Sequence, residues 1–238
     1  MHLFVGTSGY AYKQWKGKFY PAKCTDKDML GFYGQQFNTV EINNTFYRMP
    51  SERVLEHWCE EVPQDFSFSI KASRRITHHG RLKDVSDSVA FLFKQLAVMG
   101  NKLGPVLFQL PPNLKLDLPR LLSFLDLLPA NQKVALEFRH ISWFDDAVFA
   151  ALRERDVALC IADGELKEDV PFVSTAPWGY LRLRAVEYTD DAIGDWAEVV
   201  RSQDWNEVYV FFKHEDEATG PRLAKRFIEI CECEGARV

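Results

Sequence analysis

Residues 134–144, with the sequence VALEFRHISWF, decide the fold of this chain. The stretch begins as an apolar strand, but Glu137 and Arg139 share one parity and stand at its carboxyl end. Taking a carboxylate or a guanidinium out of water is unfavourable unless partners compensate for the lost solvation. Charged residues in this position are typical of the active-site face of an α/β barrel. The stretch therefore predicts a polar site that other strands help to build.

Further short apolar runs alternate with helical patterns from one end of the chain to the other. This alternation indicates βα units and a parallel sheet. Eight such units in 238 residues match a closed (β/α)8 barrel, the TIM-barrel fold, better than an open doubly wound sheet. We therefore predict a single α/β domain over residues 1–238. The predicted strands are Leu3–Gly6, Thr39–Asn43, Ser67–Lys71, Val106–Leu110, Val134–Arg139, Val157–Asp163, Tyr180–Arg184 and Val208–Lys213.

Apolar residues at helical spacing fill several intervals between these strands. Val89, Leu92, Leu96 and Met99 form one such stripe, and Gly100 follows where a C-terminal cap belongs. Similar stripes predict helices over residues 51–58, 121–128, 193–200 and 221–235.

Composition and charge limit the classes of partner. The hydrophobic fraction of 47% is ample for a large core, and the net charge of -5 disfavours a dedicated nucleic-acid binder but allows a local basic pocket. The five cysteines show neither CxxC redox spacing nor a zinc-type pair, so reduced thiols are expected. No leader peptide or membrane span is recognisable, which predicts a cytoplasmic protein.

The first connection, residues 8–25, is rich in aromatic side chains without a helical stripe. It could form a lid or stacking wall at the catalytic face, or fold down as a plug on the barrel.

Side chains alternate between the interior and the exterior of a barrel, so parity predicts which residues face inward. The second to the eighth strand each place a polar or charged residue of inward parity at or near the carboxyl end. Internal ion pairs that only fill the barrel would explain single residues, but the whole set favours a functional site. These residues are Glu41, Asn43, Lys71, Gln109, Glu137, Arg139, Asp163, Arg182, Arg184 and Lys213.

Several motifs resemble those of the YecE-like family, domain of unknown function seventy-two, and together they cover nearly the whole chain. They are Gly6-Thr7-Ser8-Gly9-Tyr10, residues 40–48 (VEINNTFYR), residues 68–72 (FSIKA), residues 108–112 (FQLPP) and residues 137–143 (EFRHISW). The resemblance implies a TIM barrel but brings no established reaction. The chain departs from the family pattern at Arg184-Ala185 and Lys213-His214, where a His-Gly and an Asn-rich pair are common.

The favoured hypothesis is an enzyme that acts on a small anionic, hydroxyl-rich substrate such as a sugar phosphate or sugar acid. Guanidinium groups match phosphate and carboxylate bidentately, and a lysine or carboxylate can move a proton. No cofactor and no metal are expected, and the oligomeric state is not predicted. The predicted catalytic residues are Lys71, Glu137 and Asp163, and the predicted substrate-binding residues are Glu41, Asn43, Tyr47, Gln109, Arg139, Trp143, Arg182 and Lys213. Tyr47 and Trp143 are expected at the rim of the pocket.

Other chemistries stay open. Lys71 could form a Schiff base, although Glu41 and Glu137 would tend to raise its pKa. A metal-dependent phosphodiester hydrolase or isomerase could use Glu41, Glu137, Asp163 and His214 as ligands. A non-catalytic protein could bind a metabolite or a nucleic-acid end by stacking and basic contacts.

Overall fold

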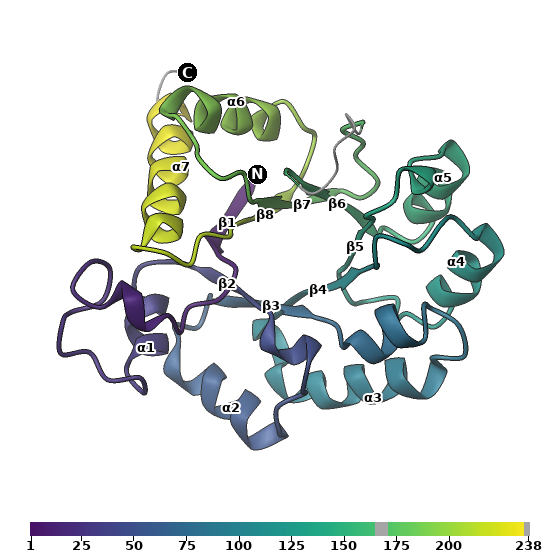
Figure 1. Cartoon of the computed structure of the whole chain (residues 1–238), viewed down its shortest axis with the longest axis horizontal. Helices are drawn as coiled ribbons and strands as arrows, with labels where there is room; N and C mark the ends of the chain where they lie inside the picture. Colours follow the sequence, from purple (N-terminus) through teal and green to yellow (C-terminus); the bar gives the residue numbers. More distant parts are fainter. Residues whose placement is uncertain (165–170, 236–238) are drawn as a thin grey trace.

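The computed structural model describes residues 1–164 and 171–235. Its strands are all parallel and follow the sheet order β1-β8-β7-β6-β5-β4-β3-β2, which curls them into a nearly closed ring (Figure 1). The single (β/α)8 TIM barrel predicted from the sequence is therefore confirmed. The strands are β1 (His2–Thr7), β2 (Thr39–Ile42), β3 (Ser67–Lys71), β4 (Leu103–Gln109), β5 (Val134–Glu137), β6 (Ala158–Ala162), β7 (Trp178–Leu183) and β8 (Glu207–Phe212).

The seam between β1 and β2 is held largely by side chains. Asn38, just before β2, donates to the carbonyl of Leu3 at 2.7 Å and accepts from the amide of Val5 at 3.2 Å. A backbone bridge joins Ser8 to Glu41 at the carboxyl end of the seam. These contacts keep β2 in the ring, so the carboxylate of Glu41 enters the barrel.

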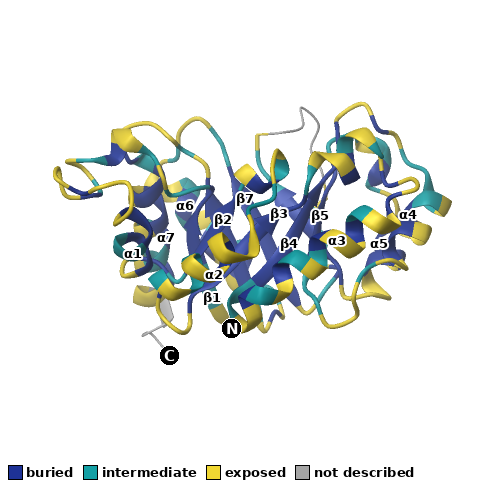
Figure 2. Ribbon diagram, turned by 90° about the horizontal axis from the view of Figure 1, so that it is seen from below, coloured by how far each residue is buried: buried dark blue, intermediate teal, exposed yellow. Residues whose placement is uncertain are grey.

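Helices surround the strands, with exposed outer faces and a buried sheet inside them (Figures 1 and 2). No helix in the described ranges is both long enough and apolar enough to span a bilayer. The α-helices are α1 (Met29–Gly34), α2 (Glu52–Glu61), α3 (Ser86–Leu96), α4 (Leu118–Leu125), α5 (Asp146–Arg153), α6 (Asp190–Arg201) and α7 (Thr219–Gly235), and short helical turns are η1 (Lys13–Trp15), η2 (Asn44–Phe46), η3 (Arg75–His79), η4 (Ala97–Lys102) and η5 (Ile141–Trp143).

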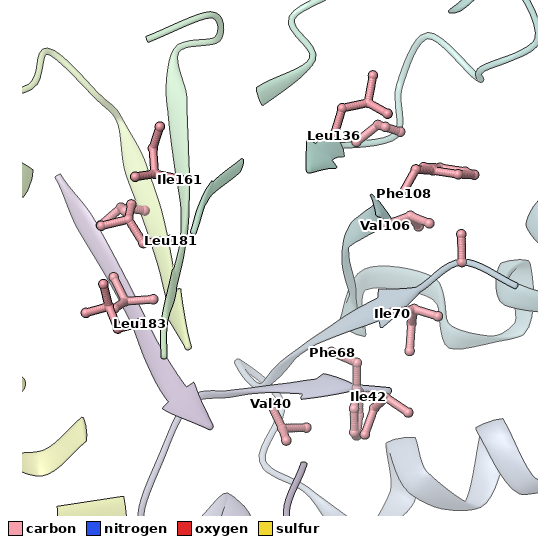
Figure 3. Packing of buried hydrophobic residues seen from close by; sticks show 14 of the residues in the cluster. Val40, Ile42, Phe68, Ile70, Val106, Phe108, Leu136, Ile161, Leu181 and Leu183 are labelled. Atoms are coloured by element: carbon pink, nitrogen blue, oxygen red, sulfur yellow. The ribbon is translucent and has the colours of Figure 1, made fainter. Parts of the chain in front are cut away.

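Alternation along the strands creates two apolar layers. Val40 and Ile42 project from the same side of β2 into the layer between sheet and helices (Figure 3). Residues of the opposite parity fill the barrel interior, as the sequence predicted. This inner core contains Leu107, Ala135, Ala158, Cys160, Trp178, Tyr180, Tyr209 and Phe211.

Several predicted strands were one or two residues too long at the carboxyl end. The backbone leaves the ladder after Ile42, Glu137, Ala162, Leu183 and Phe212. The regular ladder ends there, although the amides of Asp163 and Lys213 still donate to the carbonyls of Arg182 and Leu183 at 3.2 and 3.0 Å. As a result, the inward polar positions that follow these strands, at Asn43, Arg139, Asp163, Arg184 and Lys213, lie in the first residues of the connecting loops.

The aromatic first connection is folded onto the barrel next to α1. Trp15 and Tyr20 are fully buried, and the Trp15 indole donates to the carbonyl of Glu215 at 2.9 Å. Phe19 makes an edge contact with Phe32 of α1. These rings are part of the core and offer no open stacking wall, which agrees with the plug alternative.

Candidate functional site

Arg182 on β7 lies at the centre of a buried ionic network. Its Nε and Nη2 atoms contact the two oxygens of Glu41 at 2.8 and 2.9 Å, and its Nη1 donates to Oε2 of Glu137 at 2.5 Å. All three side chains are almost wholly inaccessible to solvent. Inward parity on β2, β5 and β7 brings them together as the top layer of the barrel interior. One guanidinium therefore joins two carboxylates from opposite parts of the sheet.

Neutral groups complete the hydrogen bonding of Glu41. Its Oε1 accepts from the Ser8 hydroxyl at 2.7 Å and from Nδ2 of Asn43 at 2.9 Å. Its Oε2 accepts from the Tyr180 hydroxyl at 2.8 Å, and that hydroxyl also contacts Oγ of Ser69 at 2.7 Å. A buried carboxylate with this many donors is well compensated for its lost hydration.

A second chain of hydrogen bonds leads from Glu137 toward the barrel mouth. Nε2 of Gln109 donates to both Glu137 oxygens at 2.8 and 2.9 Å, while its Oε1 accepts from Nζ of Lys71 at 2.9 Å. Nε of Arg139 donates to Oε1 of Glu137 at 2.9 Å. Glu137 therefore orients Lys71 through the side-chain amide of Gln109, and it orients Arg139 by a direct hydrogen bond.

The two carboxylates stay ionised at neutral pH. Burial alone would raise the pKa of Glu41, but the charge and hydrogen bonds of Arg182 outweigh it and lower the pKa to about 2. For Glu137 burial is likewise outweighed, by the charges of Arg182, Arg139 and Arg184, and its pKa is well below its usual range. A carboxylate held this way is a weak base, so its geometry suits orientation of the cations better than proton transfer.

Lys71 has the opposite character. Burial and the charge of Arg182 lower its pKa to about 8, because they outweigh the nearby Glu41 and Glu137. The two carboxylates act in the direction expected from the sequence, toward a higher pKa, but they do not decide the net shift. Nζ lies 4.6 Å from the centre of the Phe46 ring, at the inner edge of the mouth. An amine with this pKa can exchange protons near neutral pH.

The mouth of the barrel is rich in positive charge. The side chain of Arg139 is 20% exposed, Arg184 is within 3.9 Å of Glu137, and Lys213 is exposed just after β8. Burial and the charges of Arg184 and Arg182 lower the pKa of Lys213. Arginines that lower the pKa of a neighbouring lysine in this way create a local positive field in an acidic protein.

Asp163 does not take the position expected for a proton-transfer group in this network. Its carboxylate accepts from the backbone amide of Arg184 and from the Tyr188 hydroxyl. These contacts stabilise the connection after β7, and they direct the carboxylate there. The other inward residues at the strand ends, Glu41, Asn43, Lys71, Gln109, Glu137, Arg139 and Arg182, come together as predicted.

Of the two predicted rim aromatics, only Tyr47 is open to solvent. The Trp143 ring is fully buried, stacks on Phe138 with 4.7 Å between ring centres, and donates to the carbonyl of Leu114 at 2.7 Å. The prediction that Trp143 lies at the rim is wrong, because η5 turns the ring back onto the outward-facing Phe138. Tyr47 is 69% exposed and lies beside Arg74.

The side chains considered as metal ligands do not surround one common point. They are Glu41, Glu137, Asp163 and His214. Arg182 lies between Glu41 and Glu137, and Nε2 of His214 contacts the carbonyl of Ala185 at 2.7 Å. Within residues 1–164 and 171–235, no three His, Cys, Asp or Glu side chains form a group that could hold a metal ion.

Sequence reasoning did not assign roles to Ser8, Ser69 and Tyr180, which support Glu41. The signals were present, because Ser8 lies in the Gly6–Tyr10 motif and Tyr180 shares the parity of Arg182. The contact between Phe46 and Lys71 was also not predicted, since it depends on the turn η2.

Because the pKa values of Glu41 and Glu137 are depressed, the folded protein should lose stability as the pH falls. Both groups have a folded-state pKa below the unfolded value near 4.5, so their contribution is complete above that pH and is lost as the pH falls toward 2. We expect the free energy of unfolding to fall by on the order of 3 kcal/mol between pH 6 and pH 2 from Glu41 alone. Urea denaturation across this range measures it. A Glu41→Gln, Glu137→Gln and Arg182→Met triple variant should show a flatter pH dependence, and an equal slope would contradict this assignment.

Comparison with known proteins agrees with this architecture. YecE of Escherichia coli is 31% identical over 137 residues, covering 55% of this chain and 50% of that protein. YunF of Bacillus subtilis is 31% identical over 150 residues, covering 60% of this chain and 52% of that protein. Both carry the description UPF0759, and the chain spans about half the length of these curated relatives.

A solved structure and a family model extend the match to the whole chain. The crystal structure of a DUF72 family protein from Thermotoga maritima has a TM-score of 0.84 and 25% identity, and the match covers 98% of this chain and 100% of that one. The family model described as "Protein of unknown function DUF72" matches residues 4–238. This chain, a TIM barrel with a buried ionic network at the carboxyl ends of its strands, therefore belongs to the DUF72 family.

Proposed function

We propose that the barrel mouth binds a small anionic, hydroxyl-rich molecule, such as a sugar phosphate or sugar acid, and acts on it by acid/base chemistry. One observation carries the proposal: Lys71, Arg139, Arg184 and Lys213 gather around two carboxylates that already share the guanidinium of Arg182. A small anion would be attracted to this group of cations. Such a preformed field lowers the cost of binding because the cations are already held in place.

Arg139 is the best placed anion ligand in this proposal. Glu137 fixes the position of its Nε, and one fifth of the side chain is exposed at the mouth. A guanidinium fork fits phosphate and carboxylate groups bidentately. Arg182, which the sequence analysis listed as a substrate-binding residue, is fully buried. In this proposal it positions the two carboxylates and does not contact the anion.

Lys71 is the proposed acid/base group. Its pKa of about 8 lies near neutral pH, and its hydrogen bond to Gln109 fixes the amine beside the Arg139 and Glu137 pair. The protonated amine would donate to a developing negative charge on the bound molecule, and the neutral amine would accept a proton. Glu137 supplies orientation in this proposal, because its low pKa makes it a weak base.

The alternatives are less well supported. A divalent metal between Glu41 and Glu137 would have to displace the Arg182 guanidinium, which is an unfavourable loss of a buried cation that contacts both carboxylates. Stacking of a nucleic-acid end would use open aromatic surfaces at the mouth, and of the two aromatic residues predicted at its rim Trp143 is buried and Tyr47 alone is exposed.

Calorimetric titration with sulfate tests the proposal, because sulfate keeps its double negative charge throughout the working pH range. We expect one site whose affinity falls as the pH rises from 7 to 9, since Lys71 loses its charge over that interval. Lys71→Met should weaken binding about tenfold at pH 7 and remove this fall, because a charge-assisted contact is worth about 1.5 kcal/mol.

Two comparisons complete the test. Lys213→Met should retain the fall in affinity between pH 7 and 9 that Lys71 causes. Sugar phosphates should raise the melting temperature more than the same sugars without phosphate. Sulfate binding that is independent of pH in wild type, or equal in wild type and Lys71→Met, would show that Lys71 does not belong to an anion site.

A further inference from the structure

A second cavity lies outside the barrel mouth, and none of the chemistry above uses it. This side cavity has a volume of about 420 Å³ and lies between the loops after β2 and β3 and the first half of α3. Helices α2 and α3 are neighbours on this side of the barrel (Figure 1). Its lining includes the apolar side chains Tyr47, Met49, Ile76 and Phe91 and the basic residues Arg48 and Arg75. The volume is in the range of pockets that hold small organic molecules.

The apolar lining is unusually exposed for a soluble protein. Tyr47 is 69% exposed and Phe91 is 55% exposed, and the two rings border the same cavity. Exposed aromatic side chains gathered around one hollow mark a ligand or partner contact more often than scattered surface residues do. The cavity therefore offers a surface for an apolar ring.

The charge of the lining selects a negative ligand. Arg48 and Arg75 line the cavity opposite one carboxylate, that of Asp87, and Arg74 lies over the outer Tyr47 ring at 5.4 Å. Within the described residues no ion pair joins Arg48 or Arg75 to a carboxylate. Guanidinium groups at an apolar cavity favour a molecule that combines a ring with an anionic group.

The backbone at the edge of this cavity is strained in a way that fixes its shape. Residues Arg75–His79 form a π-helix, and Arg81, Leu82 and Asp84 have φ values of 51°, 65° and 52°. Non-glycine residues in this left-handed region and π-helical turns both occur preferentially at functional sites. The loop that carries Arg75 and Ile76 is thus held in one unusual conformation.

We propose that the side cavity is a second ligand site, which binds a small aromatic or polycyclic monoanion. The ring lies against Phe91, Tyr47 and Met49, and the anionic group contacts Arg48 and Arg75. The site is distinct from the barrel mouth, because its lining shares no residue with the Arg182 network.

Fluorescence titration with anilinonaphthalene sulfonate tests this proposal, because the dye joins an aromatic system to one negative group and brightens in apolar surroundings. We expect the folded wild type to bind it at one site, and Arg139→Met, which alters the mouth, should bind it as tightly as wild type does. Phe91→Ala and Arg75→Met should each weaken dye binding about tenfold. The matched controls are Leu122→Ala and Arg153→Met, which truncate an exposed apolar and an exposed basic residue on other helices.

Three results would overturn the inference. Dye binding that is equal in wild type, Phe91→Ala and Arg75→Met would place the dye elsewhere. Weaker dye binding in Arg139→Met than in wild type would place it at the mouth. A wild type that sediments as a dimer, which Phe91→Ala converts to a monomer, would show that a second copy of the chain covers the cavity. Absence of sulfate binding would count against the mouth proposal alone, since the dye titration does not depend on it.

Discussion

Replacing Arg182 by methionine should lower the free energy of unfolding at pH 7 by about 3–5 kcal/mol, because two buried carboxylates lose their shared counter-ion. Glu41 and Glu137 are inaccessible to solvent and both contact this guanidinium at 2.5 to 2.9 Å. For a barrel of this length the loss corresponds to a fall in melting temperature of about 6–20 °C. Few other single substitutions would remove the counter-ion of two buried carboxylates at once.

The sign of the pH dependence gives this prediction a second readout. In the variant, burial without the Arg182 cation should raise the pKa of Glu41 above the unfolded value, so the protein should gain stability as the pH falls from 7 to 5. Glu137 keeps its contact with Arg139 and should contribute less to this gain. Wild type should gain none over that interval, because its carboxylates have depressed pKa values.

The control for Arg182→Met is the triple variant that also carries Glu41→Gln and Glu137→Gln. Replacing a complete buried ion network by neutral groups is often close to neutral for stability, so the triple variant should recover much of the loss. Urea denaturation at pH 7 and pH 5 measures all three proteins. An Arg182→Met protein as stable as wild type at pH 7 would show that the network contributes little to folding.

Replacing Arg139 by methionine should weaken sulfate binding about 10- to 100-fold while leaving the barrel folded. A charge-assisted contact to an anion is worth about 1.5–3 kcal/mol. The side chain is partly exposed, and Glu137 keeps Arg182 and Gln109 as partners after the substitution. The variant therefore loses a proposed ligand of the anion without leaving Glu137 unpaired.

Arg153→Met provides the matched control, because Arg153 is an exposed residue at the end of α5 and its loss changes the net charge by the same amount. Calorimetric titration should give the same sulfate affinity for Arg153→Met and wild type. Equal affinity in Arg139→Met and wild type, with both proteins folded by thermal melting, would favour an ion pair that only fills the barrel.

The strand periodicity was sufficient to predict most of the network. Glu41, Glu137 and Arg182 lie on different strands, yet one rule, the alternation of side chains along a pleated strand, places all three inside the barrel. Closure of the sheet then brings strand ends together that are far apart in the chain. Strand alternation and barrel closure together are therefore enough to predict which of these residues lie close to one another.

The parts that sequence reasoning missed depend on the loops. Trp143 and Asp163 follow strand ends just as Arg139 does, but η5 turns Trp143 onto Phe138 and the loop after β7 captures Asp163 through Tyr188. Alternation says nothing about a residue once the backbone leaves the ladder. The net shift of the Lys71 pKa was also not predictable from the sequence, because it depends on how deeply the amine is buried beside Arg182.

A crystal structure with selenate tests the central claim most directly, because selenium scatters anomalously and marks the position of a tetrahedral anion without ambiguity. The proposed function requires an anomalous peak at the carboxyl face of the barrel, within hydrogen-bonding distance of the Arg139 guanidinium and the Lys71 amine. The same peak should be missing from crystals of Arg139→Met. Selenate bound only at surface lysines or arginines, with the wild-type mouth filled by water alone, would contradict an anion site in this barrel.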